Sequence, residues 1–137
     1  ERGLTQLFRR LPGRKILLTN APHAYAASVL RRLALHRHFG TRYTIERMHV
    51  HGRLRPKPSK SMLRALLARE RVKAADAVLV EDTIGNLKAA RALGLRTVLI
   101  TRHGLTRQRA RRAGPAGRGT VGLRIASLHD LARRRPR

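Results

Sequence analysis

Short apolar runs alternate along the chain with segments whose apolar residues recur at helical spacing. The runs KILLTN (15–20), DAVLVED (76–82), RTVLI (96–100) and GLRIAS (122–127) predict buried strands, and RYTIERM (42–48) predicts a weaker one. The segments around 4–11, 22–35, 60–67, 84–93 and 127–131 predict helices, and HGRLRPKPS (51–59) predicts a loop with two prolines. Ser59 is placed to cap the third helix, and Gly94 to end the fourth.

Strands that alternate with helices predict the α/β class, with a Rossmann-like, doubly wound parallel sheet covered by helices on both faces. At 137 residues the chain has the size of one domain, and an apolar share of 42% can line a core. We therefore expect a single domain over residues 1–137. The basic segments 104–119 and 133–137 are expected to be flexible.

In such sheets, ligands bind beyond the carboxyl ends of the strands. Three polar groups fall at such ends or in a nearby loop: Thr19-Asn20 after KILL, Lys57 in the loop, and Glu81-Asp82 after AVLV. Adjacent carboxylates suit a hard cation such as Mg²⁺, Thr19 can donate its hydroxyl hydrogen to phosphate, and Lys57 can supply a compact positive charge. Together these residues predict a pocket for phosphate and magnesium.

Each of these groups also has a plainer interpretation. Thr19 and Asn20 could cap the helix that follows them, and Lys57 could be a solvated loop cation. Glu81 and Asp82 could be acids favoured at a helix start by the helix dipole. The joint order and positions of the three groups favour the phosphate pocket.

Composition adds a second possibility. The 32 Lys and Arg residues against 7 acids give a formal charge of +25, which would attract nucleic acid or other polyanions. Arg-rich coding without a binding role explains the same bias, and few aromatic residues are present to stack on single-stranded nucleic acid.

The lack of Cys excludes disulfides, thiolate zinc sites and a Cys nucleophile. No apolar run is long enough to span a bilayer, so no membrane partner and a cytoplasmic location are expected.

Three motifs carry a resemblance to a known family. LLTN, RPKPS and LVEDTIGNLKAARALGLRTVLI, in that order and separation, resemble the second, third and fourth motifs of the haloacid dehalogenase-like (HAD) hydrolase superfamily. The resemblance runs from about Leu4 to Leu131. TNAPHAYAASVLRRL and EDTIGNLKAARALG are most similar to the pyrimidine 5′-nucleotidase branch, whereas other branches more often carry Gly-Ile in place of Asn86-Leu87. The resemblance implies that Asn86 supports the loops around the site.

The resemblance also implies a role for the other matched residues. Thr19 would bind the transferring phosphoryl group. Asn20 would contribute to the same binding mainly through its backbone N–H. Lys57 would balance the charge on that group and on the nucleophile. Glu81 and Asp82 would hold Mg²⁺, with Asp82 as the principal ligand.

The sequence departs from the family pattern in two places. Ser59 occupies the position after the Lys-Pro pair where the family commonly has an acidic residue. This departure affects the prediction of the helix start more than the prediction of the chemistry. Members of the superfamily attack phosphate with the first Asp of an Asp-x-Asp motif on the first, central strand and use the second as general acid and base. Asp occurs here only at positions 76, 82 and 130, so no such pair exists. The chain is expected to begin after that motif and after most of the helical cap that usually follows it.

The resemblance places that first strand between the strands KILL and AVLV. Without it, two strand edges would expose unpaired N–H and C=O groups. We therefore expect the chain to be either a fragment of a longer phosphatase or a rearranged sheet in which these two edges pair directly.

Two functional hypotheses from different classes follow. The first is a magnesium-dependent phosphatase that acts on a nucleoside monophosphate or a similar small phosphate ester and is inactive without the amino-terminal segment. The second is a non-catalytic basic module that binds nucleic acid on a HAD-like scaffold. The first requires Asp82, whereas the second predicts steep salt dependence and indifference to Asp82. The sequence does not predict an oligomeric state.

Overall fold

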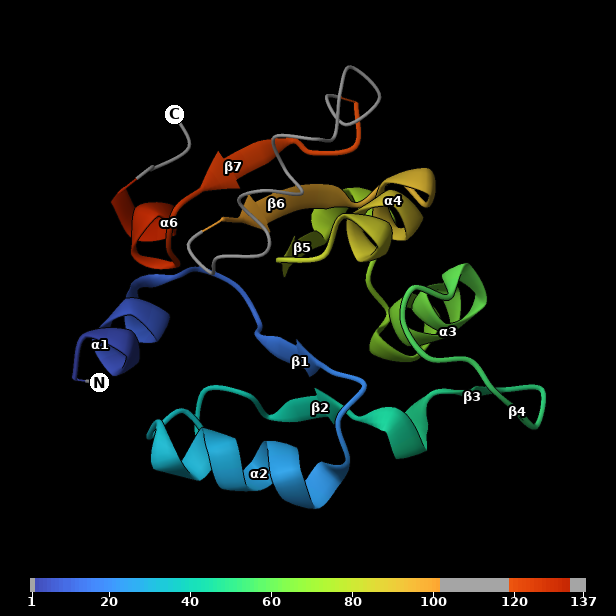
Figure 1. Ribbon diagram of the computed structural model, residues 1–137, viewed down its shortest axis with the longest axis horizontal. Coiled ribbons are helices and arrows are strands. Elements are labelled where there is room, and N and C mark those ends of the chain that lie inside the picture. Colours follow the sequence, from blue (N-terminus) through green and yellow to red (C-terminus); the bar gives the residue numbers. More distant parts are fainter. Residues whose placement is uncertain (1, 102–118, 134–137) are drawn as a thin grey trace.

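The computed structural model describes residues 2–101 and 119–133, and Figure 1 shows how their elements are arranged. In chain order the elements are α1 (Arg2–Arg10), β1 (Ile16–Leu18), α2 (His23–Arg32), β2 (Thr41–Tyr43), the 3-10 turn η1 (Ile45–Arg47), β3 (His49–Val50), β4 (Arg53–Leu54), α3 (Lys60–Glu70), the 3-10 turn η2 (Ala74–Asp76), β5 (Val78–Glu81), α4 (Ile84–Ala92), β6 (Arg96–Ile100), β7 (Leu123–Ile125) and α6 (His129–Arg133). Within these ranges, no helix combines the length and the apolar character that crossing a membrane requires.

The predicted alternation of strands and helices is confirmed, with shorter elements at some places. The weak strand predicted over 42–48 is observed as the shorter strand β2, which ends at Tyr43, followed by the turn η1. Residues 104–118 and 134–137 of the two basic segments lie outside the described residues, so their flexibility stays a prediction.

The strands form two separate parallel sheets and one small hairpin (Figure 1). β1 pairs with β2, and β5, β6 and β7 pair in that order; all these pairs are parallel. The predicted α/β class with parallel strands is confirmed. Within the described part of the chain, β1 and β5 do not pair with each other, so the alternative of a directly closed, rearranged sheet is wrong for these residues.

Local sequence rules explain where α3 begins and where α4 ends. The Ser59 hydroxyl oxygen accepts a hydrogen bond from the backbone N–H of Met62 at 3.2 Å, so Ser59 caps α3 as predicted. Gly94 follows α4 with a φ of 89°, a left-handed conformation that glycine adopts without steric cost. This glycine ends α4 and directs the chain into β6.

The hairpin of β3 and β4 lies where the sequence predicted a loop. His51 and Gly52 connect the two antiparallel strands with φ values of 49° and 72°. Two successive residues with positive φ form the tight turn whose twist matches that of hairpin strands. Each strand has only two residues. That is too short for an alternating apolar pattern to be recognised in the sequence.

Two apolar clusters cover opposite faces of β1. The α3/α4 cluster packs against Leu18 of β1 and Leu79 of β5, and it consists of Met48, Met62, Leu63, Ala89, Ala90 and Leu95. The α1/α2 cluster packs against Leu17 of β1 and Leu128 before α6, and it consists of Phe8, Leu30, Leu35 and Phe39. Because successive strand residues point to opposite faces, Leu17 and Leu18 place the two clusters on either side of the sheet plane.

Glu70, the last residue of α3, joins this helix to the sheet of β1 and β2. Its carboxylate accepts a hydrogen bond from the hydroxyl of Tyr43 in β2 at 2.8 Å and forms an ion pair with Arg14 at 2.9 Å. Arg14 also donates to the backbone carbonyl of Glu70 at 2.8 Å. Burial, together with the hydrogen bond to Glu70, raises the pKa of the Tyr43 hydroxyl. The carboxyl end of α3 is therefore fixed next to β2.

Candidate phosphate and metal site

Thr19 and Asn20 directly follow β1, at the carboxyl end of that strand. The backbone N–H of Thr19 continues the parallel pairing by donating to the carbonyl of Tyr43 at 3.0 Å. Its side-chain Oγ1 accepts a hydrogen bond from the backbone N–H of Ala21 at 3.1 Å, which closes a small turn. A hydroxyl that accepts in this way still has its own hydrogen to donate to another acceptor.

Asn20 holds the backbone of Lys57, a residue 37 positions further along the chain. The side-chain nitrogen of Asn20 donates to the Lys57 carbonyl at 3.2 Å, and its side-chain oxygen accepts from the Lys57 backbone N–H at 2.9 Å. One side chain thereby satisfies both backbone groups of Lys57, as a neighbouring strand would. The sequence predicted mainly a backbone role for Asn20, and the structure adds this second one.

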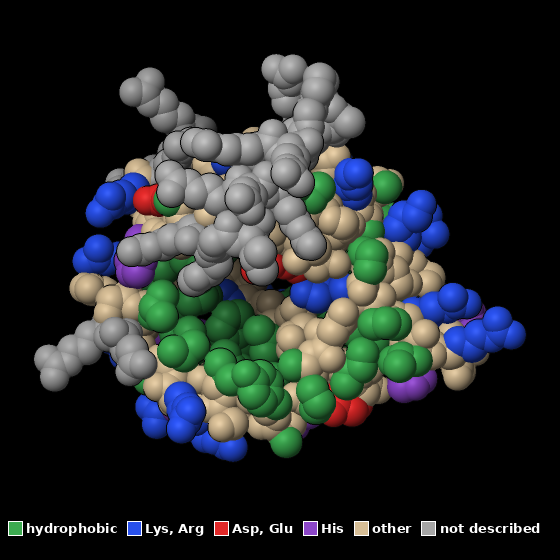
Figure 2. Space-filling view, viewed as in Figure 1, with side chains coloured by type: hydrophobic (Ala, Val, Ile, Leu, Met, Phe, Trp, Pro, Cys, Tyr) green, Lys and Arg blue, Asp and Glu red, His purple; other side chains and the backbone are tan. Residues whose placement is uncertain are grey.

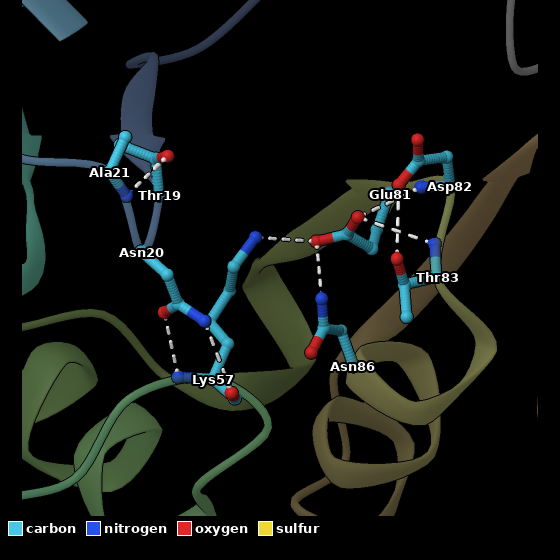
Figure 3. Close-up of polar contacts among 8 residues, drawn as sticks. All are labelled: Thr19, Asn20, Ala21, Lys57, Glu81, Asp82, Thr83 and Asn86. Atoms are coloured by element: carbon cyan, nitrogen blue, oxygen red, sulfur yellow. Dashed lines mark hydrogen bonds and ion pairs between the residues drawn. The ribbon is translucent and has the colours of Figure 1, made fainter. Parts of the chain in front are cut away.

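The side chain of Lys57 reaches from this loop to the end of β5. Its Nζ donates to Oε2 of Glu81 at 2.7 Å, and the two side chains are 15% and 10% exposed. An ammonium group has three hydrogens, so two remain for other acceptors. Figure 3 shows Asn20 on one side of the site and Glu81 on the other, with the Lys57 side chain between them.

Glu81 lies at the centre of these contacts. Its Oε2 also accepts from Nδ2 of Asn86 at 2.8 Å, and its Oε1 accepts from the backbone N–H groups of Asp82 at 3.0 Å and Thr83 at 3.3 Å. Burial is the largest influence on the pKa of Glu81 and raises it, but the interactions with Asp82 and Lys57 outweigh burial and lower this pKa from 4.5 to about 2. Glu81 is therefore ionised at neutral pH, with both oxygens engaged.

Asp82 is exposed and lies on the far side of Glu81 from Lys57 (Figure 3). Its Oδ1 accepts a hydrogen bond from the Thr83 hydroxyl at 3.1 Å. The interaction with the Glu81 side chain, followed by burial, raises the pKa of Asp82. The side-chain hydrogen bond with Glu81 favours the protonated form of Asp82, and burial and the negative charge of Glu81 raise this pKa as well.

The two acids differ in what they can offer a metal ion. Both oxygens of Glu81 already accept hydrogen bonds, whereas Oδ1 of Asp82 accepts one from the Thr83 hydroxyl and Asp82 is the more exposed of the two acids. Mg²⁺ commonly takes one or two carboxylates and completes its shell with water and phosphate oxygens. These residues suit Mg²⁺, which Asp82 would hold while Glu81 is the partner of Lys57. Across residues 2–101 and 119–133, no three His, Asp or Glu side chains come together as a metal cluster.

The structure brings the predicted site residues to one place at the ends of β1 and β5. Hydrogen bonds connect Asn20 to Lys57, Lys57 to Glu81, and Glu81 to Asn86, while Thr19 belongs to the site by its position after β1 (Figure 3). Thr83 was missed by the sequence analysis. Its position directly after the two acids, at the start of α4, is the signal that could have identified it.

Comparison with known proteins identifies the family and the fold of the chain. The profile of the haloacid dehalogenase-like hydrolases matches residues 2–94. No curated protein matches the chain. Among solved structures, a conserved haloacid dehalogenase-like protein of unknown function from Agrobacterium tumefaciens has a TM-score of 0.73 and 22% identity, over 94% of this chain and 56% of that one.

Two further structures show the same fold. The HAD phosphatase of Thermococcus onnurineus has a TM-score of 0.68 and 20% identity, over 93% of this chain and 53% of that one. The HAD-hydrolase YfnB of Bacillus subtilis, which was bound to magnesium, has a TM-score of 0.73 and 16% identity, over 97% of this chain and 54% of that one. This chain therefore spans little more than half the length of each of them. Because the family profile covers most of the sequence, the chain belongs to the haloacid dehalogenase-like hydrolases.

Proposed function

We propose that this chain is the core of a magnesium-dependent phosphatase that acts on a small phosphate monoester. The position of Lys57 carries the proposal: Asn20 fixes its backbone after β1, and its ammonium group reaches Glu81 after β5. A fixed cation between a Thr hydroxyl and an exposed Asp suits the oxygens of a phosphoryl group. Membership of the hydrolase family and the likeness to the HAD phosphatase of Thermococcus onnurineus support the same chemistry.

The residues of the chain have separate tasks in this proposal. The Thr19 hydroxyl and the N–H groups of the following turn donate to phosphate oxygens, and Lys57 donates through its two remaining hydrogens. Asp82 would hold Mg²⁺, which supplies positive charge next to the phosphate. Glu81 keeps the Lys57 ammonium aimed at the site, because it accepts that group's third hydrogen.

The reaction also needs a nucleophile. The aspartates of the chain do not supply one at this position: Asp76 lies in η2 before β5 begins, Asp130 lies in α6, and Asp82 is the proposed metal ligand. We propose that the chain is inactive alone and needs an aspartate from a further segment. The oxygen of that carboxylate would form a bond to phosphorus as the ester bond breaks and the alcohol leaves, and water would then release phosphate.

The proposed substrate is a nucleoside monophosphate. Support comes from the similarity of residues 19–33 and of the segment around Asn86 to the pyrimidine 5′-nucleotidase branch. A cytoplasmic location, where such substrates occur, stays a prediction.

Thermal unfolding with Mg²⁺ and inorganic phosphate tests the phosphate and metal site without any need for turnover. Each ligand at about tenfold its Kd stabilises the folded chain by about 1.4 kcal/mol, which corresponds to an increase in Tm of about 4 °C for a domain of this size. We expect Asp82→Asn to abolish the shift caused by Mg²⁺.

The matched control is Asp76→Asn, which removes the same charge at the opposite end of β5. It should retain both shifts. A Mg²⁺ shift that persists in Asp82→Asn, or one that disappears equally in Asp76→Asn, would refute the metal site.

A second candidate function is a nucleic-acid-binding module, and the charge of the chain favours it. The 7 acids cannot neutralise 32 Lys and Arg residues, so most cations have no acid to pair with. Polyanion binding by such a surface would depend on salt and would not depend on Asp82. The two candidates are therefore separated by the response to Asp82→Asn.

A further inference from the structure

The turn of residues 19–22, which follows β1 in the candidate site, is attached to a second element besides the Lys57 loop. The backbone carbonyl of Ala21 accepts a hydrogen bond from the N–H of Ile45 at 3.3 Å. Two residues further on, the N–H of His23 donates to Oε1 of Glu46 at 2.9 Å. Ile45 and Glu46 both belong to η1, so η1 holds the end of the 19–22 turn.

Glu46 does for α2 what the sequence next to this helix does not. Pro22 occupies the N-cap position without a side-chain hydrogen bond to the helix, and the first turn of α2 contains no acid. The first N–H groups of a helix have no partner within the helix, and a local Ser, Thr, Asp or Asn commonly accepts from one of them. Here the acceptor is a carboxylate 23 residues further along the chain, which also complements the positive end of the helix dipole.

The residues next to Glu46 hold it in place, although its own side chain is exposed. Thr44 and Met48 are buried, and Ile45 packs against the α3/α4 cluster. The Thr44 hydroxyl and the His23 N–H donate to the Glu46 carboxylate, and these two hydrogen bonds lower the pKa of Glu46. The carboxylate is therefore a fixed acceptor on an element that is anchored in the core.

This attachment determines where two hydrogen-bond donors of the 19–22 turn point. The N–H of Thr19 donates to Tyr43, and the N–H of Ala21 donates to the Thr19 side chain. In the described part of the chain, the N–H of Asn20 has no hydrogen-bond partner. This N–H and the hydrogen of the Thr19 hydroxyl are therefore available to an anion. Their directions depend on the shape of the turn, which β2 fixes at its start and η1 at its end.

The charge of Glu46 does not explain an acid at this position. A carboxylate at the end of the 19–22 turn repels a phosphate bound by the turn, and the chain has only 7 acids against 32 Lys and Arg residues. Figure 2 shows how sparse acidic side chains are on one face of the molecule, whereas Lys and Arg project around its edge. What Glu46 contributes to an anion site is therefore geometric.

We propose that Glu46 is a positioning residue for the phosphate site. It holds the end of the 19–22 turn through the His23 N–H and thereby aims the Asn20 N–H and the Thr19 hydroxyl at the phosphate. Glu46 acts through the turn and does not itself touch the phosphate. The effect on phosphate rests on the proposed function, whereas the effect on the turn rests on the hydrogen bonds alone.

Amide hydrogen exchange of the chain, followed by NMR, tests the effect on the turn. The reporter is the amide of Ala21, which is bonded to Thr19 and not to Glu46. In Glu46→Ala we expect this amide to exchange at least roughly fivefold faster than in the wild type. The amide of Thr19 pairs with β2, so it serves as an internal reference and should change little. Glu46→Gln retains an oxygen acceptor at the same distance along the side chain and should restore slow exchange.

Isothermal titration calorimetry with inorganic phosphate and with Mg²⁺ tests the effect on the site. Glu46→Ala should weaken phosphate binding about threefold, the loss expected for one exposed hydrogen bond, and leave Mg²⁺ binding unchanged. Glu46→Gln should bind phosphate at least as tightly as the wild type, because it keeps the acceptor and removes the repelling charge. A residue that only stabilised the fold would lower Tm without this selective loss of phosphate affinity.

The matched control is Asp130→Ala. Oδ2 of Asp130 accepts from the backbone N–H groups of Ala126 and Ser127 at 3.0 Å each, so this acid holds the start of α6 as Glu46 holds the start of α2. Its loss should lower Tm to a similar extent. Phosphate affinity and the exchange of the Ala21 amide should both stay at their wild-type values.

Three results would overturn the proposal: unchanged Ala21 exchange in Glu46→Ala, tighter phosphate binding in Glu46→Ala, or a loss of phosphate affinity that Asp130→Ala or Glu46→Gln reproduces. The proposed function can fail separately. If the wild type binds no phosphate while the Ala21 amide responds to Glu46→Ala as expected, the hold of Glu46 on the turn is supported and the phosphate site is refuted.

Discussion

Asn20 and Glu81 fix the same lysine by different means. Asn20 holds the backbone of Lys57 with two hydrogen bonds, and Glu81 holds its ammonium group with an ion pair. The first contact sets where the loop lies, and the second sets where the charge lies. Separate substitutions at the two positions should therefore have different effects.

We expect Asn20→Ala to weaken the binding of inorganic phosphate about fivefold while Mg²⁺ binding stays unchanged. The lost hydrogen bonds are exposed and contribute about 1 kcal/mol in total, and without them Lys57 samples positions away from the phosphate. Isothermal titration calorimetry with each ligand measures both affinities. Asn20→Asp places a carboxylate oxygen against the Lys57 carbonyl and a negative charge beside the phosphate, so it should lose at least as much affinity as Asn20→Ala. Unchanged phosphate affinity in Asn20→Ala would contradict this role.

Glu81 should make the free energy of unfolding fall as the pH falls from about 4.5 to about 2. The pKa of Glu81 is about 2 in the folded chain and 4.5 as its ordinary value. Below pH 4.5 the unfolded chain therefore takes up the proton first, and the stabilisation present above that pH is lost. The pKa of Asp82 is raised above its ordinary value of 3.8, so protonation of Asp82 makes the free energy of unfolding rise as the pH falls through that range.

Urea unfolding at several pH values between 5 and 2 measures this effect. The difference between the wild type and Glu81→Gln should shrink as the pH falls, because Gln does not titrate. A difference that stays constant over this range would show that the charge of Glu81 does not stabilise the fold.

The places of Thr19, Lys57, Glu81 and Asp82 at the ends of strands or in a nearby loop could be predicted from the sequence, because recognisable strands precede them; their roles in ligand binding stay predictions. Which of these residues contact each other could not be predicted from the sequence. Whether Glu81 faces a metal or a lysine depends on the path of a loop, and the side chain of Asn20 sets that path by contacting Lys57 far along the chain. No local pattern contains such a contact.

At the scale of elements, the apolar pattern was sufficient for the strands and helices of three residues or more. It was insufficient for β3 and β4, because a two-residue strand has no periodicity. The turn between them depends on backbone conformation, and only Gly52 hinted at it in the sequence. The separation of the strands into two sheets also lies beyond local pattern, since it depends on which edges find a partner.

Two glycines should respond in opposite ways to Ala. Gly52 has a φ of 72°, so Gly52→Ala should cost about 1 kcal/mol through backbone strain in the hairpin. Gly85 lies in α4, and an added Cβ there meets nothing within 4 Å. Gly85→Ala should therefore stabilise the chain by about 0.5 to 1 kcal/mol, because Ala favours the helix. Urea unfolding of both variants checks the signs, and destabilisation by Gly85→Ala would contradict the description of α4.

At the scale of the whole molecule, the charge of +25 should make nucleic-acid binding steeply dependent on salt. For a 20-nucleotide single-stranded DNA, we expect a slope of about −4 or steeper in a plot of the logarithm of the association constant against that of the salt concentration. Fluorescence anisotropy over a range of KCl concentrations measures it. Asp82→Asn should leave the slope unchanged, and a flat response would exclude a role for the charge in nucleic-acid binding.

Helix α3 has a further consequence for the molecule as a whole. Before its first turn, Lys57 is fastened to Asn20 and Glu81; at its last residue, Glu70 is fastened to Tyr43 and Arg14. In the described residues β1 and β5 do not pair with each other, so the distance between the two sheets is not set by sheet hydrogen bonds. The helix, about 16 Å long, is anchored to the side of β1 and β2 at both ends and to Glu81 of β5 near its start, so it fixes the carboxyl end of β5 relative to β1.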